Sequence, residues 1–209
     1  MNTELIDLGI SDYVEAHAVQ LQYVENLIDG SGEEAIIVTE HRPVFTLGKN
    51  GGERSLLMSR PEIEEAGVAI VDTERGGDVT YHGPGQIVVY PILHLRRRGM
   101  SVAEYIDILE QIMIDTAATI GVCAWRDPRN RGVWVGDSKL GSIGIRVRRS
   151  VSFHGLALNV NMASEHFSWI QPCGLSGVGI TSLARELDRQ LATTDVKPLL
   201  CDTLIQYFG

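Results

Sequence analysis

Cysteine, lysine and histidine side chains in glycine-rich segments are the residues of this chain that could do covalent chemistry. Cys173 stands in the segment Gln171-Pro172-Cys173-Gly174, where the neighbouring proline and glycine expose the thiol and leave room for a carbonyl carbon. A thiolate is a strong nucleophile, and a nearby cation lowers the pKa of a thiol. Cys173 is therefore a candidate nucleophile that could attack a carbonyl carbon, with an ordinary loop cysteine as the alternative.

The other two cysteines fit a structural role. Cys123 falls in an apolar, strand-like run and Cys201 on a terminal helix beside leucines, where a free cysteine usually behaves as a small buried hydrophobe. An odd count of three without a Cys-x-x-Cys pair predicts reduced thiols rather than a zinc site or a redox pair. Because the N-terminus also has no signal-peptide pattern, we expect a cytoplasmic protein.

Three residues could supply the cation beside the thiol: Lys139, His82 and His154. Lys139 opens a strand-like segment in which Gly141 and Gly144 follow, and glycine inside a strand often marks the close approach of a ligand. The alternative for Lys139 is a solvated charge at a strand edge. The alternative for His154 is a hydrogen-bonded structural histidine.

The longest glycine-rich segment runs from Arg75 to Gln86 and leads into an apolar run. Its twelve residues include four glycines, which let the backbone approach a ligand closely. Arg75, Tyr81 and His82 add hydrogen-bond donors beside that backbone. We predict that this segment lines a ligand site and that His82 positions the ligand rather than reacting with it.

Several motifs of cofactor chemistry do not occur in the chain. It has no phosphate-binding Gly-x-x-x-x-Gly-Lys-Ser/Thr loop, no Gly-x-Gly-x-x-Gly, no His-Glu-x-x-His and no Gly-x-Ser-x-Gly. The six histidines show no metal-ligand spacing. We therefore expect no bound metal and no cofactor, and a cysteine remains the candidate nucleophile.

Composition and charge narrow the class of protein further. The 209 residues are 44% hydrophobic and carry a net charge of −9, and no apolar run approaches the roughly 20 residues of a membrane span. An acidic chain is also a poor match for nucleic acid. We expect neither a membrane nor a nucleic-acid partner, and one domain over residues 1–209, because no linker divides the chain.

Hydrophobic periodicity predicts an α+β fold. A first helix is expected over about 12–29, with Ser11 as its cap and Val14, Ala18, Leu21 and Ile28 on one side. A second is expected over 102–120, where Ser101 and Glu104 form a capping box. Two further helices are expected over 181–188 and 196–208. Strands are expected over 35–39, 44–47, 68–72, 87–93, 122–126 and 132–135, followed by a hairpin of 139–147 and 152–160. Most neighbouring strands lack the helix that a parallel crossover needs. The sheet is therefore predicted to be mixed and largely antiparallel, with helices packed on it and two long helices on one face.

Four segments, in this order, carry a resemblance to a known family. They are Arg75-Gly76-Gly77-x-x-Thr80-Tyr81-His82-Gly83-Pro84-Gly85-Gln86, Lys139-x-x-x-Ile143-Gly144, His154-Gly155-Leu156-Ala157-Leu158-Asn159 and Pro172-Cys173-Gly174. With these segments the chain resembles the lipoyl(octanoyl) transferases over about residues 5–208. Asp78 and the run Leu140-Gly141-Ser142 depart from the family pattern, but neither touches its reactive pair.

The resemblance implies a fold related to the biotin and lipoate protein ligases and a reactive pair of Cys173 and Lys139. It implies transfer of octanoyl from octanoyl-acyl carrier protein, through a thioester on the cysteine, to a lysine of a lipoyl domain, as the first step of protein lipoylation. The acceptors would be the lipoyl domains of 2-oxoacid dehydrogenases and the glycine cleavage H protein, and phosphopantetheine would enter only as part of the donor. The implied substrate-binding residues are Arg75, Gly76, Gly77, Asp78, Val79, Thr80, Tyr81, His82, Ser142, Ile143, Gly144, Gly155, Leu156 and Ala157, with His154 as a secondary candidate.

Two other functions stay open on the residues alone. An ATP-dependent lipoate or biotin protein ligase would need a lysine but no nucleophilic cysteine, and a non-catalytic acyl-binding module would need neither. The basic clusters Arg96–Arg98 and Arg146, Arg148 and Arg149 are either solvated strand ends or docking patches for an acidic protein partner.

Overall fold

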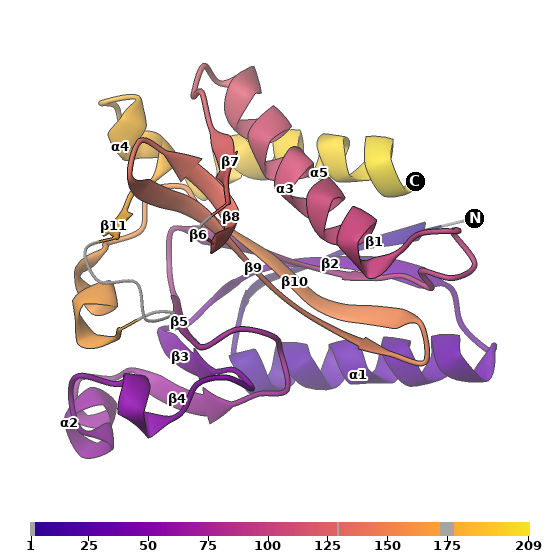
Figure 1. Cartoon of the computed structure of the whole chain (residues 1–209), viewed down its shortest axis with the longest axis horizontal. Helices are drawn as coiled ribbons and strands as arrows, with labels where there is room; N and C mark the ends of the chain where they lie inside the picture. Colours follow the sequence, from indigo (N-terminus) through magenta and orange to yellow (C-terminus); the bar gives the residue numbers. More distant parts are fainter. Residues whose placement is uncertain (1–2, 129, 172–177) are drawn as a thin grey trace.

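Two β-sheets and the helices packed on them make up the fold (Figure 1). The computed structural model describes residues 3–128, 130–171 and 178–209. In chain order the elements are β1 (Thr3–Ser11), α1 (Tyr13–Asp29), β2 (Glu34–His41), β3 (Val44–Leu47), η1 (Glu53–Ser55), α2 (Arg60–Glu65), β4 (Ala69–Asp72), β5 (Val79–His82), β6 (Gln86–Ile92), α3 (Val102–Thr119), β7 (Trp125–Asp127), β8 (Asn130–Val135), β9 (Ser138–Arg148), β10 (Val151–Asn159), η2 (Glu165–Trp169), β11 (Gly179–Ile180), α4 (Leu183–Glu186) and α5 (Thr193–Phe208), where η marks a 3₁₀ helix.

The larger sheet has the strand order β1-β2-β6-β10-β9-β8-β7, and β11 also pairs with β9. β1 runs parallel to β2 and β11 parallel to β9, while the other neighbouring strands are antiparallel. The predicted mixed, largely antiparallel sheet is therefore confirmed. At its centre lies the β9–β10 hairpin, in which the register pairs Ile145 with His154 and Gly144 with Gly155.

Helices cover both faces of this sheet (Figure 1). Because successive strand residues point to opposite faces, Ile36 and Val38 of β2 pack towards α3 and α5, whereas Ile37 between them packs towards α1. The expectation of two long helices on one face is confirmed for α3 and α5. A third long helix, α1, lies on the opposite face.

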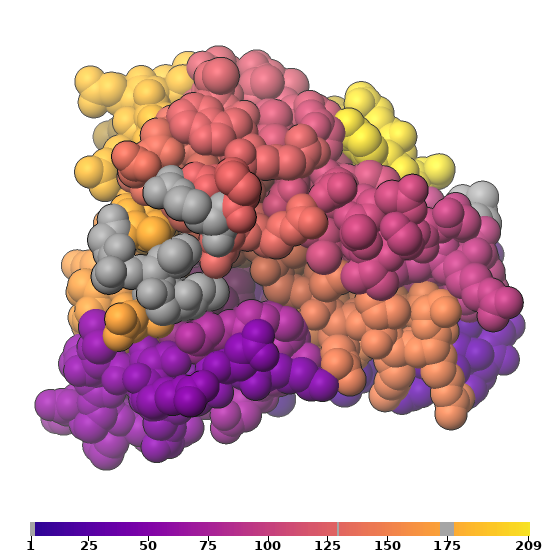
Figure 2. Space-filling view, in the orientation of Figure 1, coloured from indigo at the N-terminus to yellow at the C-terminus, as the bar shows by residue number. Residues whose placement is uncertain are grey.

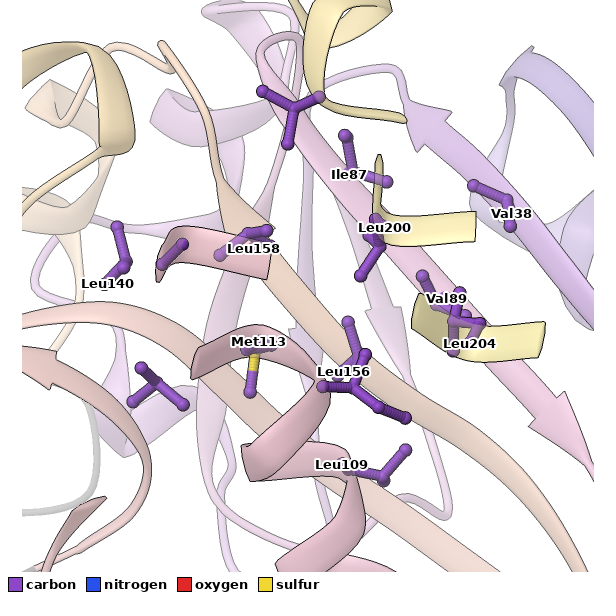
Figure 3. Packing of buried hydrophobic residues seen from close by; sticks show 14 of the residues in the cluster. Val38, Ile87, Val89, Leu109, Met113, Leu140, Leu156, Leu158, Leu200 and Leu204 are labelled. Carbon is purple, nitrogen blue, oxygen red and sulfur yellow. The ribbon is translucent and has the colours of Figure 1, made fainter. Parts of the chain in front are cut away.

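The core under α3 and α5 is apolar and closely packed. In Figure 3, Leu109 and Met113 of α3 lie around Leu156 of β10, and Leu204 of α5 lies beside Val89 of β6. All five side chains are buried. Burial of one such side chain stabilises the fold by roughly 1.5–3 kcal/mol. The capping box predicted for α3 is confirmed, since Ser101 and Glu104 exchange hydrogen bonds at its start.

The smaller sheet, in the order β4-β3-β5, is an excursion from the larger one. The chain leaves the larger sheet at the end of β2 and returns to it at β6, which is the next strand over. Phe45, Leu47, Ile63, Val79 and Tyr81 form its own core beneath α2. The excursion places the glycine-rich segment between the two sheets.

The start of the chain departs from the sequence expectations. The expected cap Ser11 is wrong, because that residue ends an unpredicted strand, β1, and its hydroxyl bonds Thr39 Oγ1 at 2.8 Å. Val14 is 62% exposed, and the buried side of α1 consists of Tyr13, Ala16, Gln20, Val24 and Leu27. Apolar periodicity misses this face because two of its residues, Tyr13 and Gln20, are polar side chains with buried hydrogen-bond partners.

Neither remaining cysteine matches the expected full burial. β7 begins only at Trp125, so Cys123 precedes the strand and is exposed, while Cys201 is half-buried against the core under α5. Desolvation raises the pKa of the Cys201 thiol.

Among the helices of the described chain, none combines the length and the apolar composition that a membrane crossing requires.

Candidate functional site

A cavity of about 340 Å³ opens where the two sheets meet. In Figure 2 a hollow lies between the residues of the smaller sheet below and the β8–β10 region above. The volume falls in the range of roughly 300–1,000 Å³ typical of small-ligand sites. The predicted site residues that line it are Arg75, Gly76, Gly77, Asp78, Val79, Thr80, His82, Lys139, Ser142, Ile143, Gly144, His154, Gly155, Leu156 and Ala157.

The cavity follows strand β9 from Lys139 to Ile145. At about 3.3 Å per residue, these positions are roughly 20 Å apart along the strand. Apolar side chains line the stretch between them, including Ile143 of β9, Leu156 of β10 and Val88 of β6. The shape suits an elongated apolar ligand with its reactive group near Lys139.

Lys139 is held by two residues that sequence reasoning did not single out. Its ammonium Nζ donates a hydrogen bond of 2.6 Å to Asn130 Oδ1 and lies 5.5 Å from the centre of the Trp134 ring. A neutral amide oxygen and an aromatic face both favour the ammonium form without cancelling its charge. Both residues come from β8, which pairs with β9, so only the strand pairing could have shown their role.

Cys173 lies outside the described residues, but the structure describes the chain on both sides of residues 172–177. On the near side, Ile170 pairs with Leu56 and the N–H of Gln171 donates to the Ser55 carbonyl at 2.9 Å. On the far side, Val178 lines the cavity, and in β11 Ile180 pairs with Lys139. The far flank of the cysteine segment therefore borders the cavity and lies against Lys139, whereas the near flank is tied to residues 55 and 56.

Arg75 anchors the glycine-rich wall to the smaller sheet. Its guanidinium is buried and donates to Thr46 through Nε at 2.9 Å and Nη2 at 2.6 Å, and to the Gly76 carbonyl through Nη1 at 3.0 Å. The N–H of Gly76 in turn donates to Ile145 at 2.8 Å. The wall is thereby tied to β3 on one side and to β9 on the other.

Gly144 and Gly155 allow neighbouring backbone segments of the protein, and not only a ligand, to approach β9 and β10 closely. A side chain at Gly144 would lie 3.1 Å from the Gly76 carbonyl, and one at Gly155 would collide with the Val89 carbonyl of β6. Glycine in a strand permits such close backbone approach. Both glycines line the cavity, so their approach to a ligand stays a prediction, and the role that the structure shows is to pack β9 and β10 against their neighbours.

Asp78 and Ser55 connect the wall to the cysteine segment. Asp78 Oδ1 accepts hydrogen bonds of 2.7 Å from the Ser55 hydroxyl and from the N–H of Val79. Ser55 uses its carbonyl for Gln171, as described above. Asp78, which departs from the family pattern, is thus a structural hydrogen-bond acceptor that also borders the cavity.

Buried neutral histidines and tyrosines lie at the far end of the cavity. Desolvation lowers the pKa of His82 to about 3 and that of His41 to about 4. The His82 Nδ1–H donates to Gln86 Oε1 at 2.6 Å, and the Tyr90 hydroxyl donates to His41 Nε2 at 2.7 Å. Tyr13 packs its ring against both imidazoles. Imidazoles that burial keeps neutral do not supply a cation, which leaves Lys139 as the candidate cation among the described residues.

Tyr81 stands apart from the other predicted site residues that the structure describes. On β5 the side chain alternates away from the cavity, and its ring stacks on His166 at 4.6 Å and contacts Phe45 in the core of the smaller sheet. Burial raises the pKa of its hydroxyl to about 12. Its assignment to the substrate stays a prediction that the cavity lining does not support.

The two basic clusters separate in the structure. Arg98 is nearly buried, pairs with Glu34 and donates to the Phe208 carbonyl, so this residue is structural. Arg148 is 42% exposed, pairs with Glu25 and lies next to the exposed Arg149 in the β9–β10 turn. Arg96 and Arg97 of the first cluster are exposed, however, so both clusters keep an accessible basic surface.

The comparisons with known proteins decide the family. The model of the lipoyl protein ligase A/B catalytic domain matches residues 12–205. The chain belongs to this family. Among its relatives, the octanoyltransferase of Desulfotalea psychrophila is 49% identical over 98% of this chain and 93% of its own length, and that of Geobacter sp. (strain M21) is 46% identical over 91% and 90%.

Solved structures agree on the fold. A structure of the bi-partite lipoate protein ligase and its E2 lipoyl domain from Thermoplasma acidophilum gives a TM-score of 0.76 at 12% identity, over 99% of this chain and 83% of that one. Biotin protein ligase from Aquifex aeolicus gives 0.55 at 10% identity, over 97% and 69%. The predicted resemblance is thus confirmed, both in fold and in the prediction that the chain is an enzyme of octanoyl transfer.

Proposed function

We propose that this octanoyltransferase carries octanoyl as a thioester on Cys173 between octanoyl-acyl carrier protein and a lysine of a lipoyl domain. The observation that carries the proposal is the position of Lys139. Its ammonium lies at one end of an elongated apolar cavity, and β11, which follows the cysteine segment, pairs with β9 at this lysine. A cation beside a thiol favours the thiolate.

In the first half-reaction, the Cys173 thiolate attacks the carbonyl carbon of the donor thioester. The new C–S bond forms as the bond to phosphopantetheine sulfur breaks, and the departing thiolate takes a proton from the Lys139 ammonium. Octanoyl is then bound to Cys173 and Lys139 is neutral. No cofactor or ATP is needed, because the donor thioester is already activated.

In the second half-reaction, the neutral amine of the acceptor lysine attacks the Cys173 thioester. The amide bond forms, the C–S bond to the cysteine breaks, and Lys139 takes the proton that the amine loses. The enzyme returns to a thiolate paired with an ammonium. The Asn130 hydrogen bond keeps Nζ in place in both half-reactions, since an amide oxygen accepts from either form of the amine.

The cavity gives the octanoyl tail a place to lie. Its apolar residues between Lys139 and Ile145 would remove the tail from water, which is favourable by about 25 cal/mol per Å² of buried apolar surface. The described part of the wall also supplies the glycine-rich backbone of residues 75–78. We propose that Arg75, Gly76, Gly77, Thr80, Ser142, Gly144 and, on β10, Gly155, Leu156 and Ala157 bind the substrate, as the resemblance implies.

The donor and acceptor proteins are expected to meet this enzyme through basic groups. Acyl carrier proteins and lipoyl domains are usually acidic, and an acidic enzyme would repel them unless basic residues flank the site. The exposed Arg96 and Arg97, and Arg148 and Arg149 in the β9–β10 turn, are the accessible candidates.

Intact mass measurement after incubation with octanoyl-acyl carrier protein tests the proposal. We expect wild type to gain one octanoyl group and to lose it when a lipoyl domain is added. Cys173→Ala should gain none, whereas the matched variant Cys123→Ala, which removes another accessible thiol, should react like wild type.

Two results would overturn the assignment. An octanoyl adduct on Cys173→Ala would place the nucleophile elsewhere. Modification of a lipoyl domain from free octanoate and ATP, without a protein-bound donor, would instead make the chain a ligase.

A further inference from the structure

Three side chains that the transfer reaction does not use meet behind the glycine-rich wall. They are His17 on α1, Glu74 in the loop after β4, and His154 on β10, and their ligand atoms lie within 4.8 Å of one another. His17 Nε2 is 3.2 Å from Glu74 Oε1, and His154 Nε2 is 3.8 Å from Glu74 Oε2. The two imidazole rings are stacked, with centres 5.2 Å apart and planes 12° from parallel.

His154 points to a ligand at this place. The residue is 1% exposed, and its Nε2 has no hydrogen-bond partner in the described part of the chain, because the 3.8 Å separation from Glu74 exceeds a hydrogen bond. A buried polar atom without a partner costs stability. The backbone at His154 is held at a φ of +55°, with its N–H donating to Gln20 Oε1 at 2.9 Å, so the imidazole is fixed in this position.

We propose that His17, Glu74 and His154 bind a first-row divalent cation of the zinc type. Two imidazole nitrogens and one carboxylate are a donor set that suits such ions rather than Mg²⁺ or Ca²⁺, which take oxygen ligands. Ligand bonds of about 2.1 Å require the three ligand atoms to draw together slightly. His17 and Glu74 are 21% and 35% exposed, which leaves room for water as the remaining ligand.

The surroundings of His154 fit this assignment. Its other ring nitrogen, Nδ1, lies 3.4 Å from the Tyr13 hydroxyl. Metal-binding histidines commonly donate the second ring N–H to such a partner, which fixes the tautomer that binds the ion through Nε2. Tyr13 would therefore be a positioning residue for the ion, while its ring borders the cavity.

The ion would act on the shape of the acyl site rather than on the chemistry at Cys173. Glu74 directly precedes Arg75, where the glycine-rich wall begins, while His17 and His154 belong to α1 and β10. An ion bound to all three would fasten the wall to both elements at the end of the cavity away from Lys139. Positions 17, 74 and 154 are too far apart in the sequence to form a spacing motif. For this reason the sequence alone led to the expectation that no metal is bound.

Zinc titration of chelator-treated protein by calorimetry tests this site. A Cys173→Ala background removes the proposed nucleophile as a competing ligand. We expect one ion per chain, with affinity at least ~10-fold weaker in His17→Ala and in Glu74→Gln. Tyr13→Phe should weaken binding by about 10-fold, as loss of an outer hydrogen bond to a ligand does. His94→Ala, which removes a histidine outside the cluster, is the matched control and should bind as the background does.

Cobalt absorption spectra supply a second readout. Co²⁺ bound here should show the visible bands of a nitrogen and oxygen site without the near-ultraviolet band of a thiolate ligand. Absence of binding, unchanged affinity in both His17→Ala and Glu74→Gln, or a thiolate band would each overturn the proposal. Because His17 and Glu74 are partly exposed, circular dichroism can confirm that these two variants remain folded.

Discussion

The two ends of the cavity are built in different ways. At one end the half-buried Lys139 ammonium contacts the Asn130 amide and the Trp134 ring. At the other end neutral imidazoles and phenols are buried, with Tyr90 hydrogen-bonded to His41 and His82 hydrogen-bonded to Gln86. The first end keeps a charge available to a substrate, whereas at the second end the charged groups, Arg75 and Glu74, are engaged by protein partners.

This difference assigns separate tasks to the two ends. A reacting group needs a proton that it can lose and regain, which burial among neutral residues would prevent. A pocket for an apolar tail needs instead a fixed boundary of rings and apolar groups. Substitutions at the Lys139 end should therefore change rates with little effect on stability, and substitutions at the histidine end should change stability in a pH-dependent way.

The largest effect is expected for Lys139→Ala. Removing the proposed proton carrier should slow octanoyl transfer by at least ~100-fold, the lower limit of typical acid–base catalysis. Initial rates of lipoyl-domain octanoylation measure this, with thermal unfolding as the check that the fold is unchanged. Lys139→Arg is the matched control: it keeps the charge but cannot exchange a proton. A rate near wild type in Lys139→Arg would show that charge alone suffices.

Ala157→Leu should make the enzyme discriminate between acyl chains. Ala157 is buried and lines the cavity on β10, so a larger side chain there removes space for the tail. Octanoyl transfer should fall by roughly 10- to 200-fold, the effect of a few methylenes in a filled pocket, while butanoyl transfer falls less. Transfer rates for both donors measure the ratio. An equal loss with the two donors would place the tail elsewhere.

Asn130→Ala should produce a smaller effect at the reactive end. Loss of a hydrogen bond to a charged group is worth about 1.5–3 kcal/mol, and part of it should appear as a roughly 10-fold slower transfer. The pH profile of Cys173 alkylation should move to higher pH as well, because an ammonium that is no longer held in place stabilises the thiolate less. Asn130→Asp adds a carboxylate, which also disfavours the thiolate, and should move the profile further in the same direction. An unchanged profile in both variants would remove Asn130 from the site.

The smallest effect is expected at the histidine end, in the dependence of stability on pH. The pKa values of about 4 for His41 and about 3 for His82 lie below the ordinary value of 6.5. The unfolded chain therefore binds more protons than the folded one, and stability falls as the pH drops below 6.5. Each histidine contributes about 1.4 kcal/mol per pH unit in this window.

Urea unfolding at pH 7, 6 and 5 measures that dependence. His41→Gln should remove one histidine's share of the slope, whereas Lys139→Ala should leave the slope as in wild type. A flat wild-type profile between pH 6.5 and 5 would mean that these imidazoles are not buried in their neutral form.

The sequence predicted which residues line the cavity better than it predicted the contacts that hold them in place. Repeated local signals, such as the capping box before α3 and the alternation in β9 and β10, gave the main elements correctly. The sequence assigned residues from glycine-rich segments far apart in the chain to one site. Among the predicted site residues that the structure describes, all except Tyr81 line the same cavity. These predictions rest on family motifs and on local patterns that a single chain displays.

The remainder depends on contacts between distant residues. Tyr13 and Gln20 are buried polar residues on α1, and a hydrophobic period assigns them to the exposed side. Asn130 and Trp134 meet Lys139 only because β8 pairs with β9. The meeting of His17, Glu74 and His154 requires three separate elements to be in place. No local pattern in the chain encodes such contacts.

Ser55 connects the glycine-rich wall of the cavity to the chain that leads into the cysteine segment. Its hydroxyl bonds Asp78 in the glycine-rich wall, and its carbonyl accepts from Gln171 just before the cysteine segment. If an acyl chain displaces the wall, the same residue transmits the displacement towards the nucleophile, and by reciprocity acylation of the cysteine alters how firmly the wall is held. The acylated and unacylated enzyme would then differ in affinity for donor and acceptor, so that one short 3₁₀ helix contributes to the order in which the two proteins bind.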